Sequence, residues 1–234
     1  MSRPLHRFET NAELSAELAD RIATDLASAI AENGSATLAV SGGSTPRPLF
    51  EVLSRQVLDW SLVAVTQVDE RWVDEAHSDS NARLIKQHLL QHEAAAAEFL
   101  SMKTPEDSPF TAEWAASAKL ERFAAGIDVL VLGMGEDGHT ASFFPGAASL
   151  MRAMDPAGTE VCVAVRPPEA AHDRMTLSLT TLLRATHAYL HIVGETKREV
   201  LELASEAGDA ALLPIRALLH SDALALEIYY ANRN

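Results

Sequence analysis

One stretch of the sequence, GMGEDGHTASFFP at residues 133–145, combines three glycines with two acids and a histidine. The glycines have the G-x-G-x-x-G spacing of a dinucleotide-binding turn. That function also needs a long helix after the turn, an acid at the end of the next strand and no anion facing the pyrophosphate. Here Glu136 and Asp137 occupy the turn, Pro145 limits the helix, and the next predicted strand ends in Arg166. The pattern therefore predicts a tight turn after a strand rather than a nucleotide site.

The same turn presents His139 as a candidate general base. We expect a helix to begin there, and a helix amino terminus disfavours the charged form of a histidine, which keeps a neutral imidazole available. Asp137 acts in the opposite direction, so no net pKa shift is predicted. A single histidine is often structural, and eight others are present. The position of His139 after a strand, between acids and small residues, distinguishes it from them.

A second glycine-rich turn, SGGSTP, follows the apolar run 36–40. Gly42 and Gly43 allow a close backbone approach, Ser44 and Thr45 add hydroxyl donors, and Pro46 suits the first turn of a helix, whose free N–H groups attract anions. The turn is not a P-loop, because the G-K-[ST] ending is absent. It is a candidate phosphate-binding loop. A plain strand-to-helix turn, in which the glycines only satisfy the backbone geometry, explains the sequence equally well.

Charged residues follow the apolar run 61–68, where the sequence reads DERW. Asp69, Glu70 and Arg71 place two acids and a guanidinium at the predicted end of a strand. A structural ion pair explains each of them as well as a catalytic role does. Asn81, in the capping sequence DSN before a predicted helix, is a weaker candidate.

Two other kinds of site are disfavoured. His88 and His92 have the i, i+4 spacing of zinc ligands, but the segment HLLQH lacks the glutamate of H-E-x-x-H, and a solvated helix face is the preferred interpretation. We therefore predict no metal. No G-x-S-x-G nucleophile elbow occurs, so a hydrolase of this kind would use water.

Composition limits the partners and the setting. The 234 residues carry a formal net charge of -14, which disfavours nucleic-acid and anionic-membrane binding. Cys162 is the only cysteine, so an intramolecular disulfide is excluded. Neither a signal-peptide pattern nor an apolar run of about 20 residues is present. We expect a soluble, cytoplasmic protein with a single domain over residues 1–234 and a small-molecule substrate; the oligomeric state, monomer or dimer, stays open.

The elements that must position these residues alternate along the chain. Thr10-x-x-Glu13 has the form of a capping box, and leucine and isoleucine then recur every four residues up to Gly34, which predicts a helix. Strands are predicted at 36–40, 61–68, 127–132, 161–165, 188–193 and 224–230, with helices after Thr45, Asp79 and Gly194. This alternation predicts an α/β fold with a mostly parallel sheet, in which ligands bind at the carboxyl ends of the strands.

Taken together and in order, the segments VSGGSTP, VDERWV with DSN, GMGEDGHTASFFPG and DRMTLSLTTLLRA resemble the 6-phosphogluconolactonase family, within a larger group that includes glucosamine-6-phosphate deaminases. The resemblance runs from about residue 8 to about residue 220. It departs at Asp74, where proline is common, in the longer PPEAAHDR loop and in the loosely matching LEIYYA ending. It implies a single-domain, Rossmann-like three-layer sandwich without a bound nucleotide.

The resemblance also implies roles for individual residues. His139 would activate a water that opens 6-phospho-D-glucono-1,5-lactone to 6-phosphogluconate, in the oxidative pentose phosphate pathway and without a cofactor. Asp137 and Glu136 would orient His139, and Asp69 and Arg71 would complete the catalytic group, with Arg71 stabilising the oxyanion or binding sugar hydroxyls.

The phosphate would be held by the glycine-rich turn, namely Gly42, Gly43, Ser44 and Thr45. Arg174 in DRMTLS and Lys197 in GETKRE resemble the basic phosphate ligands of the family. Taken alone, each of these two cations is more simply a solvated charge.

Two alternatives remain at this stage. The deaminases continue as H-x-A-F-N-E-P, whereas this chain has HTASFFP, and Phe143 and Phe144 cannot transfer protons as Asn and Glu do. A non-catalytic sugar-phosphate sensor would usually carry a helix-turn-helix domain, for which this chain has neither the extra length nor a basic patch.

Overall fold

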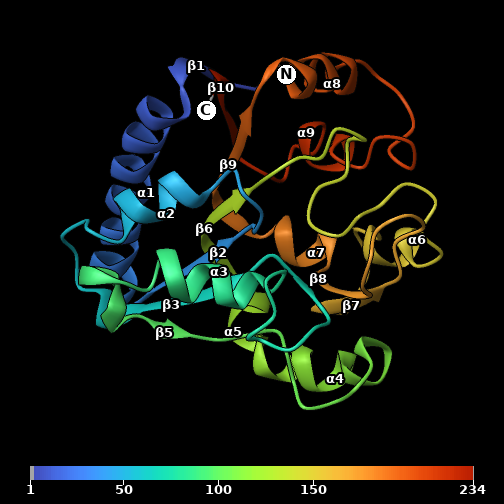
Figure 1. Ribbon diagram of the computed structural model, residues 1–234, viewed down its shortest axis with the longest axis horizontal. Coiled ribbons are helices and arrows are strands. Elements are labelled where there is room, and N and C mark those ends of the chain that lie inside the picture. The colour runs from blue at the N-terminus through green and yellow to red at the C-terminus, as the bar shows by residue number, and fades with distance from the viewer. Residues whose placement is uncertain (1–2, 234) are drawn as a thin grey trace.

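The computed structural model describes residues 3–233, and its centre is a seven-stranded sheet in which neighbouring strands all run parallel (Figure 1). Across the sheet the order is β1 (Leu5–Thr10), β10 (Leu226–Arg233), β9 (Ala185–Val193), β6 (Ile127–Leu132), β2 (Ala36–Val40), β3 (Val63–Gln67) and β5 (Glu98–Phe99). The predicted α/β class with a mostly parallel sheet is confirmed. The edge strand β1 was not predicted, because its sequence, LHRFET, is largely polar.

Helices cover both faces of this sheet because its strands are apolar on both sides. On β6, Val129 and Val131 pack into one buried cluster with α1 (Asn11–Asn33), α2 (Arg47–Leu53) and α3 (Asn81–His88). Leu130 and Leu132 pack into a second cluster with α4 (Pro109–Lys119), α8 (Glu195–Ser205) and α9 (Arg216–Leu219). Figure 1 shows α1 and α2 together, well separated from α8 and α9. The result is a three-layer arrangement.

Local signals account for the longest helix. The Thr10 hydroxyl accepts a hydrogen bond from the Glu13 N–H, and the Glu13 carboxylate accepts one from the Thr10 N–H, so the predicted capping box is present. Gly34 ends α1 in a left-handed conformation, with φ of 78°. The remaining helices are α5 (Glu121–Ala125), α6 (Leu150–Ala153), α7 (Leu179–Leu182) and the 3₁₀ turns η1 (Trp60–Leu62) and η2 (His92–Ala96). Over residues 3–233 we find no helix with the length and apolar character needed to cross a membrane.

A second, antiparallel sheet of three strands corrects one prediction. It has the order β4 (Asp69–Arg71), β8 (Arg174–Leu177) and β7 (Cys162–Val165). The run 161–165 was predicted as part of the parallel sheet, but it forms β7 here. All four residues of β7 are buried, as in β2 and β3, so the hydrophobic pattern alone does not distinguish the two sheets. The pairing of β4 with β8 sets Arg71 opposite Arg174.

Candidate active site

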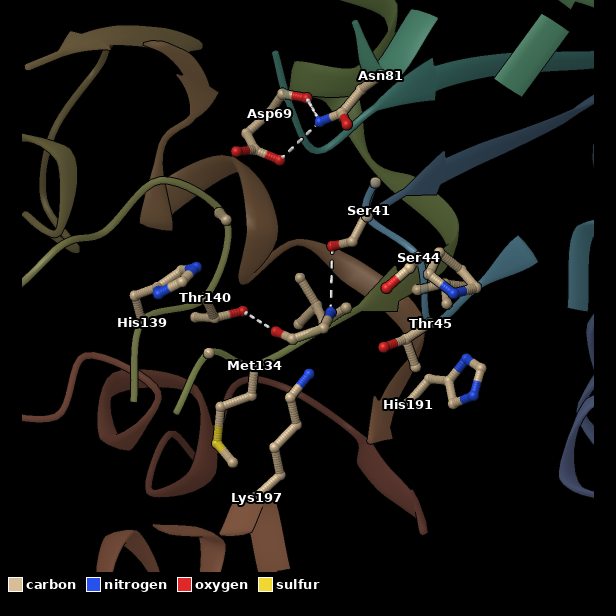
Figure 2. Close-up of a pocket in the computed structure, with 18 of the residues that line it drawn as sticks. Ser41, Ser44, Thr45, Asp69, Asn81, Met134, His139, Thr140, His191 and Lys197 are labelled. Carbon is tan, nitrogen blue, oxygen red and sulfur yellow. Dashed lines mark hydrogen bonds between the residues drawn. The ribbon is translucent and has the colours of Figure 1, made fainter. Parts of the chain in front are cut away.

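A pocket of about 240 Å³ opens at the carboxyl ends of β2 and β6 (Figure 2). The loops that follow these two strands form most of its wall. Ser41 joins them, because its hydroxyl accepts a hydrogen bond from the Gly133 N–H at 3.2 Å, and the Thr140 hydroxyl donates to the Gly133 carbonyl at 2.8 Å. The two glycine-rich turns of the sequence therefore meet in one place, at the strand ends where α/β sheets bind ligands.

The loop after β2 packs too closely for any residue but glycine at one position. A Cβ atom on Gly42 would lie 1.8 Å from the Asn81 side-chain oxygen. Figure 2 shows the hydroxyl groups of Ser44 and Thr45 turned toward the centre of the pocket. The Asn11 side-chain amide donates to the Thr45 carbonyl at 3.2 Å and so fixes the end of the loop.

His139 lines the other side of the pocket and is held by Asp137. The Asp137 Oδ1 atom lies 2.5 Å from the imidazole Nδ1 and also accepts the His139 backbone N–H at 3.1 Å. An ionised carboxylate only accepts hydrogen bonds, so Nδ1 carries the proton and Nε2 keeps a free lone pair. Partial burial by itself would raise the pKa of Asp137, but the hydrogen bond and charge of His139 outweigh it and lower that pKa. Asp137 is therefore ionised at neutral pH, and the tautomer is that of a general base at Nε2.

The prediction that a helix begins beside His139 is wrong. The Gly135 N–H donates to the His139 carbonyl at 2.8 Å, which closes a tight turn, and the next helix, α6, starts only at Leu150. A helix dipole consequently does not act on this imidazole, and Asp137 is its ionised hydrogen-bond partner. A Cβ on Gly135 would lie 2.2 Å from the His139 Nδ1 atom, so this glycine makes room for the pair.

Lys197, in the first turn of α8, brings a positive charge into the wall of the pocket, with its ammonium group turned toward Ser44 and Thr45 (Figure 2). Burial lowers the pKa of Lys197, and the charge of Glu136 opposes that shift. Glu136 thus interacts with Lys197, and its side chain makes no hydrogen bond to His139 within residues 3–233 of the structure.

His191, on β9, was not identified from the sequence, yet it lines the pocket and is only 2% exposed. Its Nε2 atom lies 2.8 Å from the side-chain oxygen of Asn11, so Nε2 carries the proton. The other ring nitrogen, Nδ1, is buried and has no hydrogen-bond partner in the described part of the chain. Burial, assisted by the charge of Lys197, lowers the pKa of His191 to about 3. The pocket therefore contains a neutral imidazole with an unused acceptor atom.

The side chain of Glu70 is buried and has a structural role. It is 1% exposed, and its carboxylate accepts backbone N–H groups from Arg71, Asn81 and Ala82 at 2.7–2.8 Å. Burial raises the pKa of Glu70 in spite of these bonds. This carboxylate joins β4 to the first turn of α3 and does not line the pocket as the structure describes it.

Asp69 and Arg71 do line the pocket, whereas Arg174 does not. Asp69 is 9% exposed and accepts the Ser142 hydroxyl at 2.6 Å. Arg174 is 7% exposed, and its guanidinium donates a hydrogen bond to the His172 carbonyl at 2.9 Å. Of the two cations that resemble phosphate ligands, the structure thus brings only Lys197 to the pocket lining.

The residues that sequence reasoning missed had weak signals. Asn11 follows the helix cap and has the sequence features of an ordinary first-turn residue. Ser41 is the first residue of the SGGSTP turn, but the pattern gave it no role of its own. His191 had the clearest signal, a histidine inside an apolar strand. For the dismissed zinc pair, α3 ends at His88, whose Nδ1 lies 3.0 Å from Glu51, and His92 belongs to the following 3₁₀ turn.

Comparisons with known proteins identify relatives of this chain along nearly its whole length. The family model described as glucosamine-6-phosphate isomerases/6-phosphogluconolactonase matches residues 9–226. A 6-phosphogluconolactonase of Rhizobium meliloti is 45% identical over 99% of this chain and 100% of its own length, and one of Pseudomonas aeruginosa is 45% identical over 90% and 88%. The crystal structure of a 6-phosphogluconolactonase from Shewanella baltica superposes with a TM-score of 0.96 at 40% identity, covering 98% of both chains.

Proposed function

This chain belongs to the glucosamine-6-phosphate isomerase/6-phosphogluconolactonase family, and on that premise we propose that it hydrolyses 6-phospho-D-glucono-1,5-lactone to 6-phosphogluconate with His139 as general base. It is an enzyme of the 6-phosphogluconolactonase type. One observation carries the assignment of the base. The free Nε2 of His139, fixed by Asp137, belongs to the same pocket as the hydroxyl groups and the ammonium group on the opposite wall.

In the proposed mechanism the phosphate binds between the Ser44–Thr45 turn and the Lys197 ammonium. Hydroxyl groups, loop N–H groups and a cation are the usual ligands of a phosphate dianion. This placement directs the lactone ring across the pocket toward His139. Arg174, which is not among the residues that line the pocket, would contribute to phosphate binding through its positive charge.

His139 Nε2 takes a proton from water while the water oxygen attacks C1 of the lactone. The tetrahedral intermediate then expels the ring oxygen, which receives the proton back from Nε2, so that one water is consumed and a carboxylic acid and a hydroxyl are formed. Arg71 would stabilise negative charge on the carbonyl oxygen, a proposal supported by its position in the pocket lining. Asp69, which is held by Ser142, would bind a sugar hydroxyl. The reaction balances without an organic cofactor or a metal.

The residues after His139 favour lactone hydrolysis over deamination of an amino sugar. Phe143 is fully buried, and the Phe144 ring lies 4.5 Å from the imidazole, centroid to centroid. Neither side chain can transfer a proton, whereas a deaminase would need a further acid–base group at these positions. The matched family includes both activities, so this local difference is the discriminating feature.

The test compares two reactions in one preparation. We expect the purified protein to accelerate opening of 6-phosphogluconolactone above its spontaneous rate at neutral pH, and to release no ammonia from glucosamine 6-phosphate. His139→Asn should lower kcat by about 10²-fold or more with little change in thermal stability. Ammonia release comparable to lactone opening would refute the reaction, and near-normal turnover by His139→Asn would refute the base. Dialysis against a chelator should leave the rate intact.

A further inference from the structure

Two histidines and an aspartate gather near Arg71 and Arg174, at a place the catalytic proposal does not use. His77 and Asp79 lie in the segment after β4, and His172 lies in the segment before β8. The His172 Nε2 atom is 3.2 Å from Asp79 Oδ2, and the His77 Nδ1 atom is 4.0 Å from the same oxygen. The three ligand atoms all lie within 4.8 Å of one another.

We propose that His77, Asp79 and His172 bind a divalent transition metal ion of the zinc class. Zinc takes histidine nitrogen and carboxylate oxygen at about 2.0–2.2 Å, so two ligands of a tetrahedral ion are about 3.4 Å apart. The observed separations of 3.2 and 4.0 Å from Asp79 Oδ2 lie on either side of that value. Two imidazoles and one carboxylate are a donor set that suits zinc, whereas magnesium and calcium prefer oxygen ligands only.

The hydrogen-bond geometry of His77 fits this role. The Asp79 backbone N–H donates to the His77 Nδ1 atom at 3.1 Å, so this nitrogen carries a lone pair and not a proton. A bound ion would replace this hydrogen bond and the one between His172 Nε2 and Asp79 Oδ2. The side chains of His77, Asp79 and His172 are 43%, 50% and 32% exposed, so an ion can reach them from solvent without any opening of the fold.

The backbone around the cluster connects it to the arginines. The Asp79 carbonyl accepts a hydrogen bond from the Arg71 guanidinium at 2.7 Å, and the His172 carbonyl accepts one from Arg174 at 2.9 Å. His172 itself has φ of 69°, an unusual conformation for a residue other than glycine. An ion that joins the Asp79 and His172 side chains would thus restrain both carbonyls that hold Arg71 and Arg174. Its role would be to stabilise these two segments of the chain, and hydrolysis by His139 would proceed without it.

Zinc binding to the purified protein, free of any histidine tag, tests the proposal directly. The metal-stripped protein is titrated with Zn²⁺ in the presence of a chromophoric competitor. We expect one site in the unmodified protein, and at least tenfold weaker binding in both His77→Ala and His172→Ala. His88→Ala is the matched control, because His88 also pairs with a carboxylate, that of Glu51. This variant should bind zinc with the same affinity as the unmodified protein.

Two results would overturn the proposal. One is equal zinc affinity in the unmodified protein, His77→Ala and His172→Ala. The other is a loss of binding in His139→Asn alone, which would place the ion on the His139–Asp137 pair instead. Because the readout is metal affinity, failure here leaves the lactone assay untouched, and failure of the lactone assay leaves this site untouched.

Discussion

Replacing Asp137 by asparagine should lower kcat for lactone hydrolysis about 10- to 50-fold and change KM little. In the structure the Asp137 carboxylate accepts the Nδ1–H of His139, which leaves Nε2 free to take a proton. An asparagine amide can donate to Nδ1 instead, and the imidazole then carries its proton on Nε2, where it cannot act as a base. The substrate still binds, because the phosphate-binding loop lies on the opposite wall.

The magnitude follows from the one bond that is lost. A hydrogen bond to a charged group contributes about 1.5–3 kcal/mol, and about 1.4 kcal/mol corresponds to a factor of ten in rate. The Asp137 side chain is 51% exposed, so water can partly replace the carboxylate, and the lower part of that range applies. The backbone bond from the His139 N–H can be kept by the asparagine oxygen, so the turn should fold normally.

Initial rates of lactone opening, corrected for spontaneous hydrolysis, give kcat and KM at several pH values. Glu227→Gln is the control, since Glu227 on β10 forms a carboxylate–histidine pair with His6 on β1 at 2.8 Å, away from the pocket. Of the two strands that carry this pair, only β1 lies at the edge of the sheet, and β10 is its neighbour. The kcat of Glu227→Gln should equal that of the unmodified enzyme. If Asp137→Asn retained more than half of kcat, or if the loss lay in KM alone, the inferred tautomer control would be refuted.

Three further expectations concern the surroundings of the pocket. Lys197→Ala should weaken binding of 6-phosphogluconate by about 1.5–3 kcal/mol in calorimetry, and Arg174→Ala should weaken it less. Inorganic phosphate should compete with 6-phosphogluconate. Equal affinity in Lys197→Ala and the unmodified enzyme would refute the assignment of the phosphate site. The pKa of His191 is lowered by burial from 6.5 to about 3, so its contribution to stability is complete above pH 6.5 and is lost as the pH falls toward 3. At pH 5 the loss is about 2 kcal/mol relative to pH 7, and chemical denaturation of His191→Gln should show a correspondingly flatter pH dependence; parallel curves would contradict the buried neutral imidazole. Gly42→Ala would place a Cβ 1.8 Å from the Asn81 oxygen, so we expect at least tenfold weaker product binding, and an unchanged affinity would show that the loop is looser than described.

Sequence reasoning was most accurate where the deciding interactions are local. The capping box at Thr10, the stop at Gly34 and the strand at 127–132 depend on residues within about four positions of one another, and each was predicted correctly. The same holds for the turn that carries Asp137 and His139. The helix predicted after that turn does not form, because a backbone hydrogen bond from the Gly135 N–H to the His139 carbonyl closes a tight turn there. The spacing of the glycines alone does not indicate this hydrogen bond.

The sequence by itself determined which residue types follow which strands, and hence the candidates on the two glycine-rich turns and the resemblance to a family. Only the tertiary structure decided which candidates meet. The strand order places β2 beside β6 and β9 beside β6, which brings Thr45, His139 and Lys197 to one pocket across more than a hundred residues of chain. The antiparallel pairing of β4 with β8 set Arg174 opposite Arg71 and brought His172 beside Asp79. Strand order and pairing depend on which apolar surfaces bury one another across the whole chain. The hydrophobic pattern of a single strand does not indicate which other strand it will pair with.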